Sequence, residues 1–315
     1  MGGGGQVVRR YHRLGALRTC IRAPGATGMT LQFRPLRDAG DDFGIEAVGV
    51  DASQPFDDAD AAAMRDAFAR HRVLVLRGQQ LAPAGHVAFS RLFGDLEIHV
   101  LDEYHKAEYP EIFELSNIGP DGRPNAIHPD RGTLVWHTDA SWQATPALAT
   151  LLYAEQVPAA GGHTLFADMI GAFEAFGKAE RERFLRLGVL HDLHVSRIKA
   201  GYEGMTERQR AQRPPVLQPL VRRHLATGKN AIYLGSHGQE IAGLPDLESR
   251  GMIERIMNHC TEPRFVYEHV WRPGDLVMWD NGATVHRATE YDTQTEPRVV
   301  RRTVVKGQAV VAGSA

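Results

Sequence analysis

Residues 275–288 read DLVMWDNGATVHRA, and this stretch decides the fold class. It holds two apolar runs, 275–280 and 284–288, with Asn and Gly between them. Short apolar runs bounded by turn-forming residues are typical of buried β-strands. We therefore predict two consecutive strands here, the second of which carries His286.

Similar runs occur along the rest of the chain. Strands are predicted at 44–50, 73–76, 112–116, 133–142, 148–156, 164–166, 189–195, 231–235, 265–271 and 299–305. Helices are predicted at 57–71, 82–93, 170–187 and 247–260. Many short strands separated by turns indicate a β-rich α+β fold, either a barrel or a jelly roll with helices packed outside. No repeat or linker interrupts this pattern, so a single domain is expected over 29–310.

The composition is that of an ordinary globular protein. The chain of 315 residues has a formal net charge of -2, which gives no support for nucleic-acid binding. No apolar run approaches the roughly 18 residues that a membrane span needs. The two cysteines, Cys20 and Cys260, lie far apart and in no metal-binding spacing, as in an intracellular protein with free thiols. We expect a cytoplasmic homo-oligomer that acts on a small molecule.

The N-terminal segment 1–28 differs from the rest of the chain. It contains five arginines, no acidic residue and a run of four glycines. An arginine-rich, acid-poor leader is compatible with a transit peptide. The plainer interpretation is an upstream-extended or disordered start, because Met29 directly precedes a strand-like run at 30–33. We exclude 1–28 from the prediction of the fold.

The segment Trp136-His137-Thr138-Asp139 is the first candidate for a metal site. On a strand, residues i and i+2 point to the same face, so His137 and Asp139 can approach one ion together. His286 is the candidate third ligand. Two histidines and one carboxylate on one octahedral face leave open positions, which is typical of non-haem iron(II) oxygenases. Among 15 histidines single ones carry little weight, and others such as His237 are interpreted as surface or core residues.

A cluster of arginines follows His286 in the chain. In the run Arg298-Val-Val-Arg-Arg302, residues 298 and 302 share one strand face. A guanidinium there can clamp the distal carboxylate of a dicarboxylate through two parallel hydrogen bonds. Thr164, in the segment Gly-Gly-His-Thr, offers a hydroxyl that can donate a further hydrogen bond to that carboxylate.

Taken together, these motifs resemble the taurine dioxygenase and dichlorophenoxyacetate dioxygenase family (TauD/TfdA). The His-Thr-Asp, Gly-Gly-x-Thr, Trp-Asp-Asn and Arg-x-x-x-Arg segments occur in the order and close to the spacing of that family. The resemblance covers essentially all of 30–307. It is closest to the dichlorophenoxyacetate type, to which the stretches 214–222, 265–267 and 274–281 are similar.

The resemblance implies a fold, an activity and a set of cofactors. The implied fold is a double-stranded β-helix, a cupin-like jelly roll, with flanking helices. The implied enzyme is an Fe(II)/2-oxoglutarate-dependent dioxygenase that consumes O2 and hydroxylates a C–H bond of a small organic anion, with an aryloxyalkanoate-like carboxylate favoured. The residues that match positions of the family are His137, Asp139 and His286 for iron, Thr164 and Arg298 for 2-oxoglutarate, and Arg302 and His99 for the substrate.

Alternatives remain open at this point. A taurine-like sulfonate is a second candidate substrate. A catalytically silent jelly-roll binding protein and a zinc hydrolase on a cupin-like scaffold are candidates from other functional classes. The sequence departs from the pattern of the family in two places. Gly282-Ala283 follows Asn281, where relatives often have an arginine or a larger residue, and the tail arginine lies about one residue further from His286 than in the taurine enzyme.

Overall fold

The computed structural model describes residues 30–37, 42–98, 105–106 and 108–315. Two predictions from the sequence fall outside these ranges: His99 as a substrate-binding residue, and the segment 1–28 as an extended or disordered start. Residues Leu31–Ala315 cluster as one compact unit. Within the described ranges, no helix has both the length and the apolar character needed to cross a membrane.

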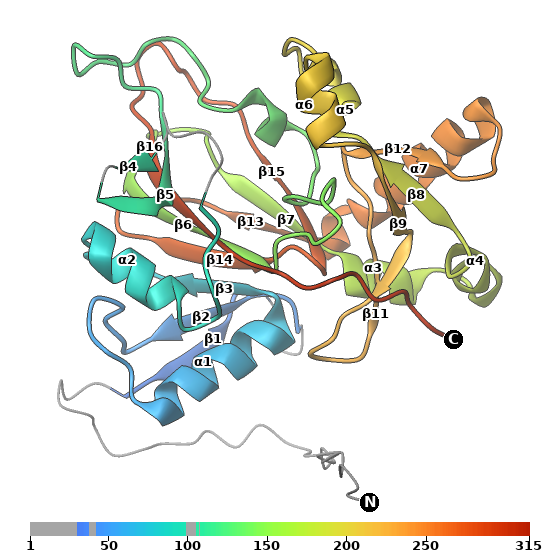
Figure 1. Cartoon of the computed structure of the whole chain (residues 1–315). Helices are drawn as coiled ribbons and strands as arrows, with labels where there is room; N and C mark the ends of the chain where they lie inside the picture. Colours follow the sequence, from blue (N-terminus) through green and yellow to red (C-terminus); the bar gives the residue numbers. More distant parts are fainter. Residues whose placement is uncertain (1–29, 38–41, 99–104, 107) are drawn as a thin grey trace, which may run out of the picture. The chain divides into compact units, whose positions relative to one another are not determined.

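The largest sheet contains eight strands in the order β1-β2-β3-β14-β6-β16-β5-β4 (Figure 1). Their bounds are Gln32–Pro35 (β1), Ile45–Val48 (β2), Val73–Leu76 (β3), His105–Lys106 (β4), Tyr109–Ser116 (β5), Ala149–Gln156 (β6), Leu276–Asp280 (β14) and Val299–Val305 (β16). The neighbouring strands pair antiparallel, except for the parallel pair β2–β3. Strands far apart in the sequence are therefore direct neighbours at the centre of this sheet.

A three-stranded antiparallel sheet packs against one face of the large sheet. It has the order β13-β7-β15, with bounds Val266–His269 (β13), Thr164–Asp168 (β7) and Thr284–Ala288 (β15). One core cluster joins the two sheets, because Val75, Val277 and Trp279 of the large sheet pack with Phe166 and Tyr267 of the small one. The two sheets thus form a sandwich, and the strands predicted at 73–76, 284–288 and 299–305 have those bounds in the structure.

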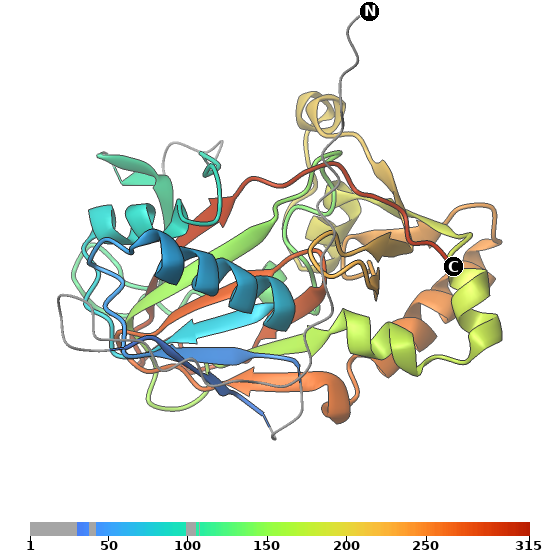
Figure 2. The ribbon, with the colours of Figure 1, turned by 90° about the horizontal axis from the view of Figure 1, so that it is seen from below.

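Helices α1 (Asp58–His71) and α2 (Pro83–Ser90) cover the opposite face of the large sheet. Figure 2 shows the blue helix α1 lying along the blue and cyan strands. The alternation of side chains in β3 explains this arrangement, since Leu74 and Leu76 pack toward the helices whereas Val73 and Val75 pack into the sandwich. The side chain of Asp57 caps α1 by accepting a hydrogen bond from the Asp60 amide.

The remaining elements lie beside the sandwich (Figure 1). They are the helices α3 (Met169–Ala175), α4 (Lys178–Phe184), α5 (Leu193–Lys199), α6 (Glu207–Gln212) and α7 (Asp246–Cys260), the strands β8 (Gly188–His191), β9 (Val216–Pro219), β10 (Val221–Arg223), β11 (Asn230–Ile232) and β12 (Gly238–Ile241), and the short 3-10 helices η2 (Arg131–Leu134) and η3 (Pro263–Phe265). Among them, α3, α4, α7, β8, β10, β11, β12 and η3 contribute to a further core cluster. Residues of η2 and α5 line a cavity of the candidate site.

The predicted strand at 133–142 is wrong. The segment begins in η2, whose first turn is capped by the Asp130 carboxylate, and continues without strand pairing except at His137. It then turns at Ala140, which has φ 58°, and the Gln143 amide donates to the Ala140 carbonyl. Local capping and a left-handed residue therefore replace the regular alternation on which the prediction relied.

Two other predictions need correction for similar reasons. The strand predicted at 189–195 stops at His191, because the Asp192 side chain caps helix α5 by accepting from the Val195 amide. The helix predicted at 170–187 is two short helices, separated by Phe176 and Gly177 in extended conformation. In both cases local backbone conformation at one or two residues overrides the pattern of apolar side chains.

Candidate metal centre and active site

The three candidate metal ligands come from two segments that the fold joins at one bridge. His137 and His286 form an isolated antiparallel β-bridge, in which each backbone amide donates to the carbonyl of the other, at 3.0 and 2.8 Å. Their imidazole centroids lie 4.1 Å apart. The sequence predicted that a full strand would bring His137 beside the other ligands. In the structure, this single β-bridge places His137 next to His286.

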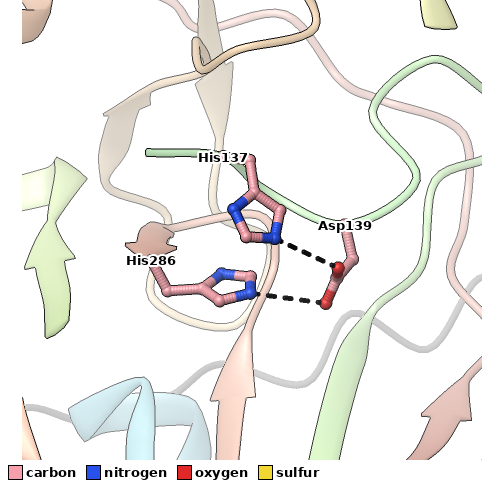
Figure 3. A group of neighbouring side chains, drawn as sticks. All are labelled: His137, Asp139 and His286. Carbon is pink, nitrogen blue, oxygen red and sulfur yellow. Dashed lines mark ion pairs between the residues drawn. The ribbon is translucent and has the colours of Figure 1, made fainter. Parts of the chain in front are cut away.

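The side chains of His137, Asp139 and His286 converge on one point (Figure 3). The Nε2 atoms of His137 and His286 each lie 3.8 Å from an oxygen of the Asp139 carboxylate. One ligand atom from each residue lies within 4.8 Å of the others. The predicted trio is therefore brought together, although Asp139 lies in a turn and not on a strand.

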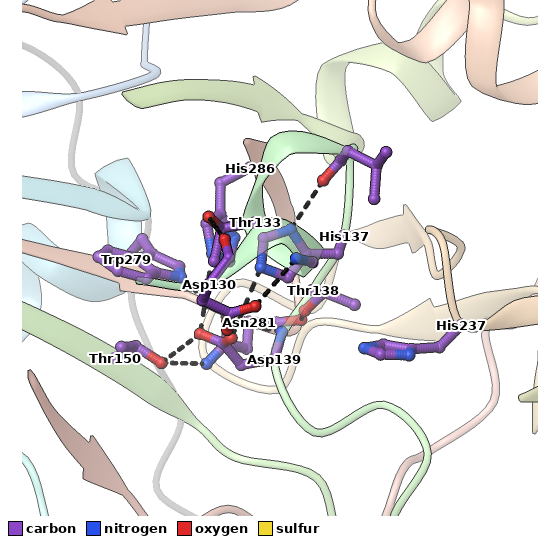
Figure 4. A network of polar contacts seen from close by, with 12 residues as sticks. Asp130, Thr133, His137, Thr138, Asp139, Thr150, His237, Trp279, Asn281 and His286 are labelled. Atoms are coloured by element: carbon purple, nitrogen blue, oxygen red, sulfur yellow. Dashed lines mark hydrogen bonds and ion pairs between the residues drawn. The ribbon is translucent and has the colours of Figure 1, made fainter. Parts of the chain in front are cut away.

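A chain of hydrogen bonds holds the Asp139 carboxylate in place (Figure 4). The Trp279 indole donates to Asn281 Oδ1 at 3.1 Å, and Asn281 Nδ2 donates to Thr150 Oγ1 at 3.0 Å. The Thr150 hydroxyl then donates to Asp139 Oδ2 at 2.6 Å. Each group in this series donates a hydrogen bond to the next one toward Asp139. Asp139 Oδ2 is therefore held by Thr150, and Oδ1 stays available to a metal. Partners that orient metal ligands in this way tune the affinity of a site.

The protonation states at this site suit a divalent cation. His137 Nδ1 lies 2.9 Å from the Val135 carbonyl and donates to it, which leaves its Nε2 lone pair for a metal. Burial and the neighbouring His137 lower the pKa of His286 to about 3, so this imidazole is neutral. Burial acts to raise the pKa of Asp139, but His286, His137 and Arg302 together outweigh it and hold the pKa at about 2. Neutral imidazoles and an ionised carboxylate are the forms that bind metal ions.

A cavity opens from the three ligands toward Thr164 and Arg298, which both line it. Thr164 lies at the start of β7, and Arg298 directly precedes β16. Arg298 is held at its backbone, because its amide donates to Asn117 Oδ1 at 2.8 Å and its carbonyl accepts from the Asn117 amide. The fold therefore places both predicted cosubstrate residues in one cavity with the metal ligands.

Arg298 carries a buried positive charge that the described protein residues do not neutralise. Its exposed fraction is 6%, and no carboxylate of the described residues lies within 4.0 Å of its guanidinium. Burial lowers the pKa of Arg298, but an arginine remains charged in proteins. Since an unpaired buried charge is strongly unfavourable, this cavity fits a ligand that supplies an anionic group.

A second cavity, of about 290 Å³, meets the first at His137, Asp139 and Arg302. Arg302 lines both cavities, with its guanidinium 4.7 Å above the ring of Phe113. No ion pair within 4.0 Å joins Arg302 to a carboxylate in the described part of the chain, and its Nε is buried without a hydrogen-bond partner. The wall of this cavity also contains Trp142, Leu193, Val304 and Glu97.

His237 is a cavity residue that the sequence interpretation dismissed as surface or core. It lines the second cavity and faces the metal ligands in Figure 4. The Ser196 hydroxyl donates its one hydrogen to the Leu193 carbonyl, so His237 Nδ1, which lies 2.8 Å from Ser196 Oγ, donates to that oxygen. Burial lowers the pKa of His237 to about 3, so the ring is neutral. No spacing in the sequence marks His237, because only the packing of α5 against the turn before β12 brings it to the cavity.

The departure at Gly282 has a steric explanation. A Cβ atom at this position would lie 2.8 Å from Cζ of Arg222 and 3.0 Å from Asp280 Oδ1. The guanidinium of Arg222, whose Nε is buried, lies 4.9 Å above the Tyr233 ring. Arg222 is therefore not a freely solvated charge, since its side chain fills the space beside Gly282.

Comparisons with known proteins agree with this geometry. Residues 32–304 match the family described as "Taurine catabolism dioxygenase TauD, TfdA family". The chain is 36% identical over 247 residues to an alpha-ketoglutarate-dependent 2,4-dichlorophenoxyacetate dioxygenase of Cupriavidus pinatubonensis, covering 76% of this chain and 86% of the relative. It is 32% identical over 278 residues to an (S)-phenoxypropionate/alpha-ketoglutarate-dioxygenase of Sphingobium herbicidovorans, covering 84% of this chain and 92% of that protein.

Solved structures give the same result. A crystal structure described as AAD-2 in complex with Mn(II) and N-oxalylglycine superposes with a TM-score of 0.80 and 33% identity, covering 90% of this chain and 99% of the other. The predicted jelly-roll core and the predicted resemblance are thereby confirmed. The chain therefore belongs to the TauD/TfdA family of dioxygenases.

Proposed function

We propose that this enzyme hydroxylates a C–H bond of a small organic anion, with an aryloxyalkanoate-like carboxylate as the favoured substrate. The reaction class is that of an Fe(II)/2-oxoglutarate-dependent dioxygenase. In the balanced reaction, the substrate, 2-oxoglutarate and O2 give the hydroxylated substrate, succinate and CO2. When bound, iron and 2-oxoglutarate supply the activation of O2. We further propose that residues 29–310 form a single dioxygenase domain, which the compact unit Leu31–Ala315 supports.

The roles of the protein residues follow from their places in the two cavities. His137, Asp139 and His286 would hold iron on one face and leave its other positions directed into the cavities. Arg298 and Thr164 would hold the distal carboxylate of 2-oxoglutarate. Both cavities adjoin the metal ligands, so the residues that line them would position both reactants before the reaction begins.

The substrate proposal depends on Arg302 above all. Arg298 and Arg302 line one cavity beside the metal ligands, and they repel each other unless each has its own anion. Arg298 has 2-oxoglutarate. Arg302 lines the second cavity and forms no ion pair within 4.0 Å among the described residues, although Asp139 and Glu97 line the same cavity; a substrate anion would be its direct counterion. Relatives named for dichlorophenoxyacetate and phenoxypropionate support a carboxylate on an aromatic ether.

For an aryloxyacetate, the proposal predicts which products form. Hydroxylation of the carbon between the ether oxygen and the carboxylate gives a hemiacetal. The hemiacetal carbon–oxygen bond then breaks, the phenol oxygen takes the proton, and glyoxylate is released. A panel of ether acids, sulfonates and amino acids, scored by substrate-dependent succinate formation, would test the class. A preference for taurine-like sulfonates over all carboxylates would overturn the aryloxyalkanoate assignment.

Arg302→Ala should raise the KM for the best anionic substrate by about tenfold to a hundredfold. The reason is the loss of a charge-assisted hydrogen bond, which contributes roughly 1.5–3 kcal/mol. Decarboxylation of 2-oxoglutarate in the absence of substrate should persist, because Arg298 and the metal ligands are unchanged. Steady-state kinetics of succinate and product formation measure both.

The control for this variant is Arg91→Ala, which removes an exposed ion pair with Glu111 outside both cavities. Its kinetics should match the unmodified enzyme, since exposed pairs contribute little. A neutral methyl ester of the best substrate should turn over poorly. Equal turnover of ester and acid would contradict the proposed role of Arg302, and the cavity would then be an apolar site.

A further inference from the structure

We propose that Trp271 is a positioning residue for 2-oxoglutarate, because it sets the direction of the hydrogen bond made by Thr164. The proposal deepens the proposed function and rests on it. Trp271 lies two residues beyond the end of β13 and lines neither cavity. Its side chain is nevertheless in direct contact with the hydroxyl that we assign to the cosubstrate.

The contact is one buried hydrogen bond. Trp271 Nε1 donates to Thr164 Oγ1 at 3.0 Å, and the exposed fractions of the two residues are 6% and 4%. An indole N–H is only a donor, whereas a threonine hydroxyl has one hydrogen to donate and two lone pairs to accept with. Trp271 therefore occupies a lone pair of Thr164 and cannot accept its hydrogen.

The hydrogen of the Thr164 hydroxyl is then left to be donated to a ligand in the cavity. Within the described residues, no protein group accepts a hydrogen bond from Thr164 Oγ1. Thr164 lines the cavity that also contains the unpaired Arg298. The hydroxyl is thus prepared to donate into this cavity, where a carboxylate is the acceptor that Arg298 selects. Without Trp271, the hydroxyl could rotate and accept as readily as it donates, and part of the binding energy would be lost in orienting it.

The indole itself is held firmly. Its ring makes an edge-on contact with His269, with ring centroids 4.5 Å apart and an angle of 78°. Both nitrogens of the fully buried His269 are hydrogen bonded, Nε2 to Asp275 Oδ2 at 3.1 Å and Nδ1 to the Tyr267 hydroxyl at 3.0 Å. A rigid neighbour of this kind keeps Trp271 in one orientation, which is what a positioning role requires.

The test measures binding directly, in protein loaded with Mn(II). The probe is N-oxalylglycine, a 2-oxoglutarate analogue that is not turned over, and titration calorimetry gives its Kd. Trp271→Phe should weaken binding about three- to tenfold, as for the loss of one oriented hydrogen bond. Thr164→Val should weaken it at least as much, and the double variant should bind like Thr164→Val alone to within about twofold.

Kinetics provide a second readout that a merely structural role would not move. Trp271→Phe should raise the KM for 2-oxoglutarate and leave kcat at saturating 2-oxoglutarate within about twofold. Tyr233→Phe is the matched control, because it removes the hydroxyl of a buried aromatic residue that lines neither cavity. Its KM for 2-oxoglutarate should not change. If Trp271→Phe does not fold, 3-benzothienylalanine at position 271 removes the N–H and keeps the shape of the ring.

The outcomes separate this inference from the function on which it rests. Unchanged binding in both Trp271 variants, with weakened binding in Thr164→Val, would overturn the role of Trp271 and leave the cosubstrate site intact. If Trp271→Phe weakens binding equally in the unmodified protein and in the Thr164→Val variant, Trp271 acts through packing, which also overturns the proposal. Unchanged binding in Thr164→Val would instead refute the assignment of Thr164 itself.

Discussion

Asp139→Ala should abolish substrate-dependent succinate formation and leave the purified protein with little bound iron. Asp139 supplies the only carboxylate among the three convergent ligands, and two imidazoles alone bind iron(II) weakly in an open site. Loss of a group that only supports a ligand typically costs roughly 10–100-fold in metal affinity or activity. Removal of the ligand should therefore cost more. Metal analysis and turnover at saturating iron measure the two effects separately.

Two further variants calibrate this result. Thr150→Val removes the hydrogen bond to Asp139 Oδ2 and keeps all three ligands, so it should cause a partial loss within that 10–100-fold range. Asp121→Ala changes an exposed turn residue and should have no effect. Near-normal turnover of iron-replete Asp139→Ala would refute the assignment of the three ligands.

Arg298→Gln should raise the concentration of 2-oxoglutarate required for half-maximal activity by more than about thirtyfold. Truncating one partner of a buried, hydrogen-bonded charge pair costs roughly 2–5 kcal/mol. The exposed fraction of Arg298 is 6%, and no carboxylate of the described residues lies within 4.0 Å of it, so 2-oxoglutarate would be its only counterion. Titration of the visible absorption band that forms when 2-oxoglutarate is added to the anaerobic iron(II) protein measures this affinity.

A 2-oxo acid that lacks the distal carboxylate provides the control. The unmodified enzyme should prefer 2-oxoglutarate strongly over 2-oxopentanoate, and Arg298→Gln should lose most of that preference. Folding should be retained, because the contacts of Asn117 are with the backbone of Arg298 and not with its side chain. If Arg298→Gln had the same apparent affinity for 2-oxoglutarate as the unmodified enzyme, another arginine would have to bind the distal carboxylate.

Strand identity was predictable wherever a short apolar run alternated between two packed faces. The runs 73–76, 284–288 and 299–305 have the predicted bounds, because most of their side chains are buried on paired strands. Prediction failed at 133–142 and 189–195, where the side chains of Asp130 and Asp192 cap helical turns and interrupt the alternation. Such caps depend on a single hydrogen bond, which a pattern of hydrophobic residues does not reveal.

The candidate site shows the same division. The sequence showed which side chains could bind a metal, and it identified the candidate trio of His137, Asp139 and His286. The ability of an imidazole or a carboxylate to bind a metal depends on residue type and not on the fold. His237, Thr150 and Trp271 carried no such signal. Thr150 and Trp271 reach the site through hydrogen bonds to Asp139 and Thr164, and His237 reaches it by lining the second cavity.

By itself, the sequence determined which groups were available to bind a metal and an anion and which segments were suited to be strands, since both depend on residue type and on spacing within a few positions. Only the tertiary structure decided how those groups meet. The β-bridge between His137 and His286 and the pairing of β16 with β5 and β6 join segments distant in the chain. Such pairings place Asp139 beside two imidazoles and leave Arg298 and Arg302 facing cavities without a carboxylate partner among the described residues. The physical reason is that contacts between distant segments depend on the packing of the whole sandwich, whereas local patterns report only on neighbouring residues.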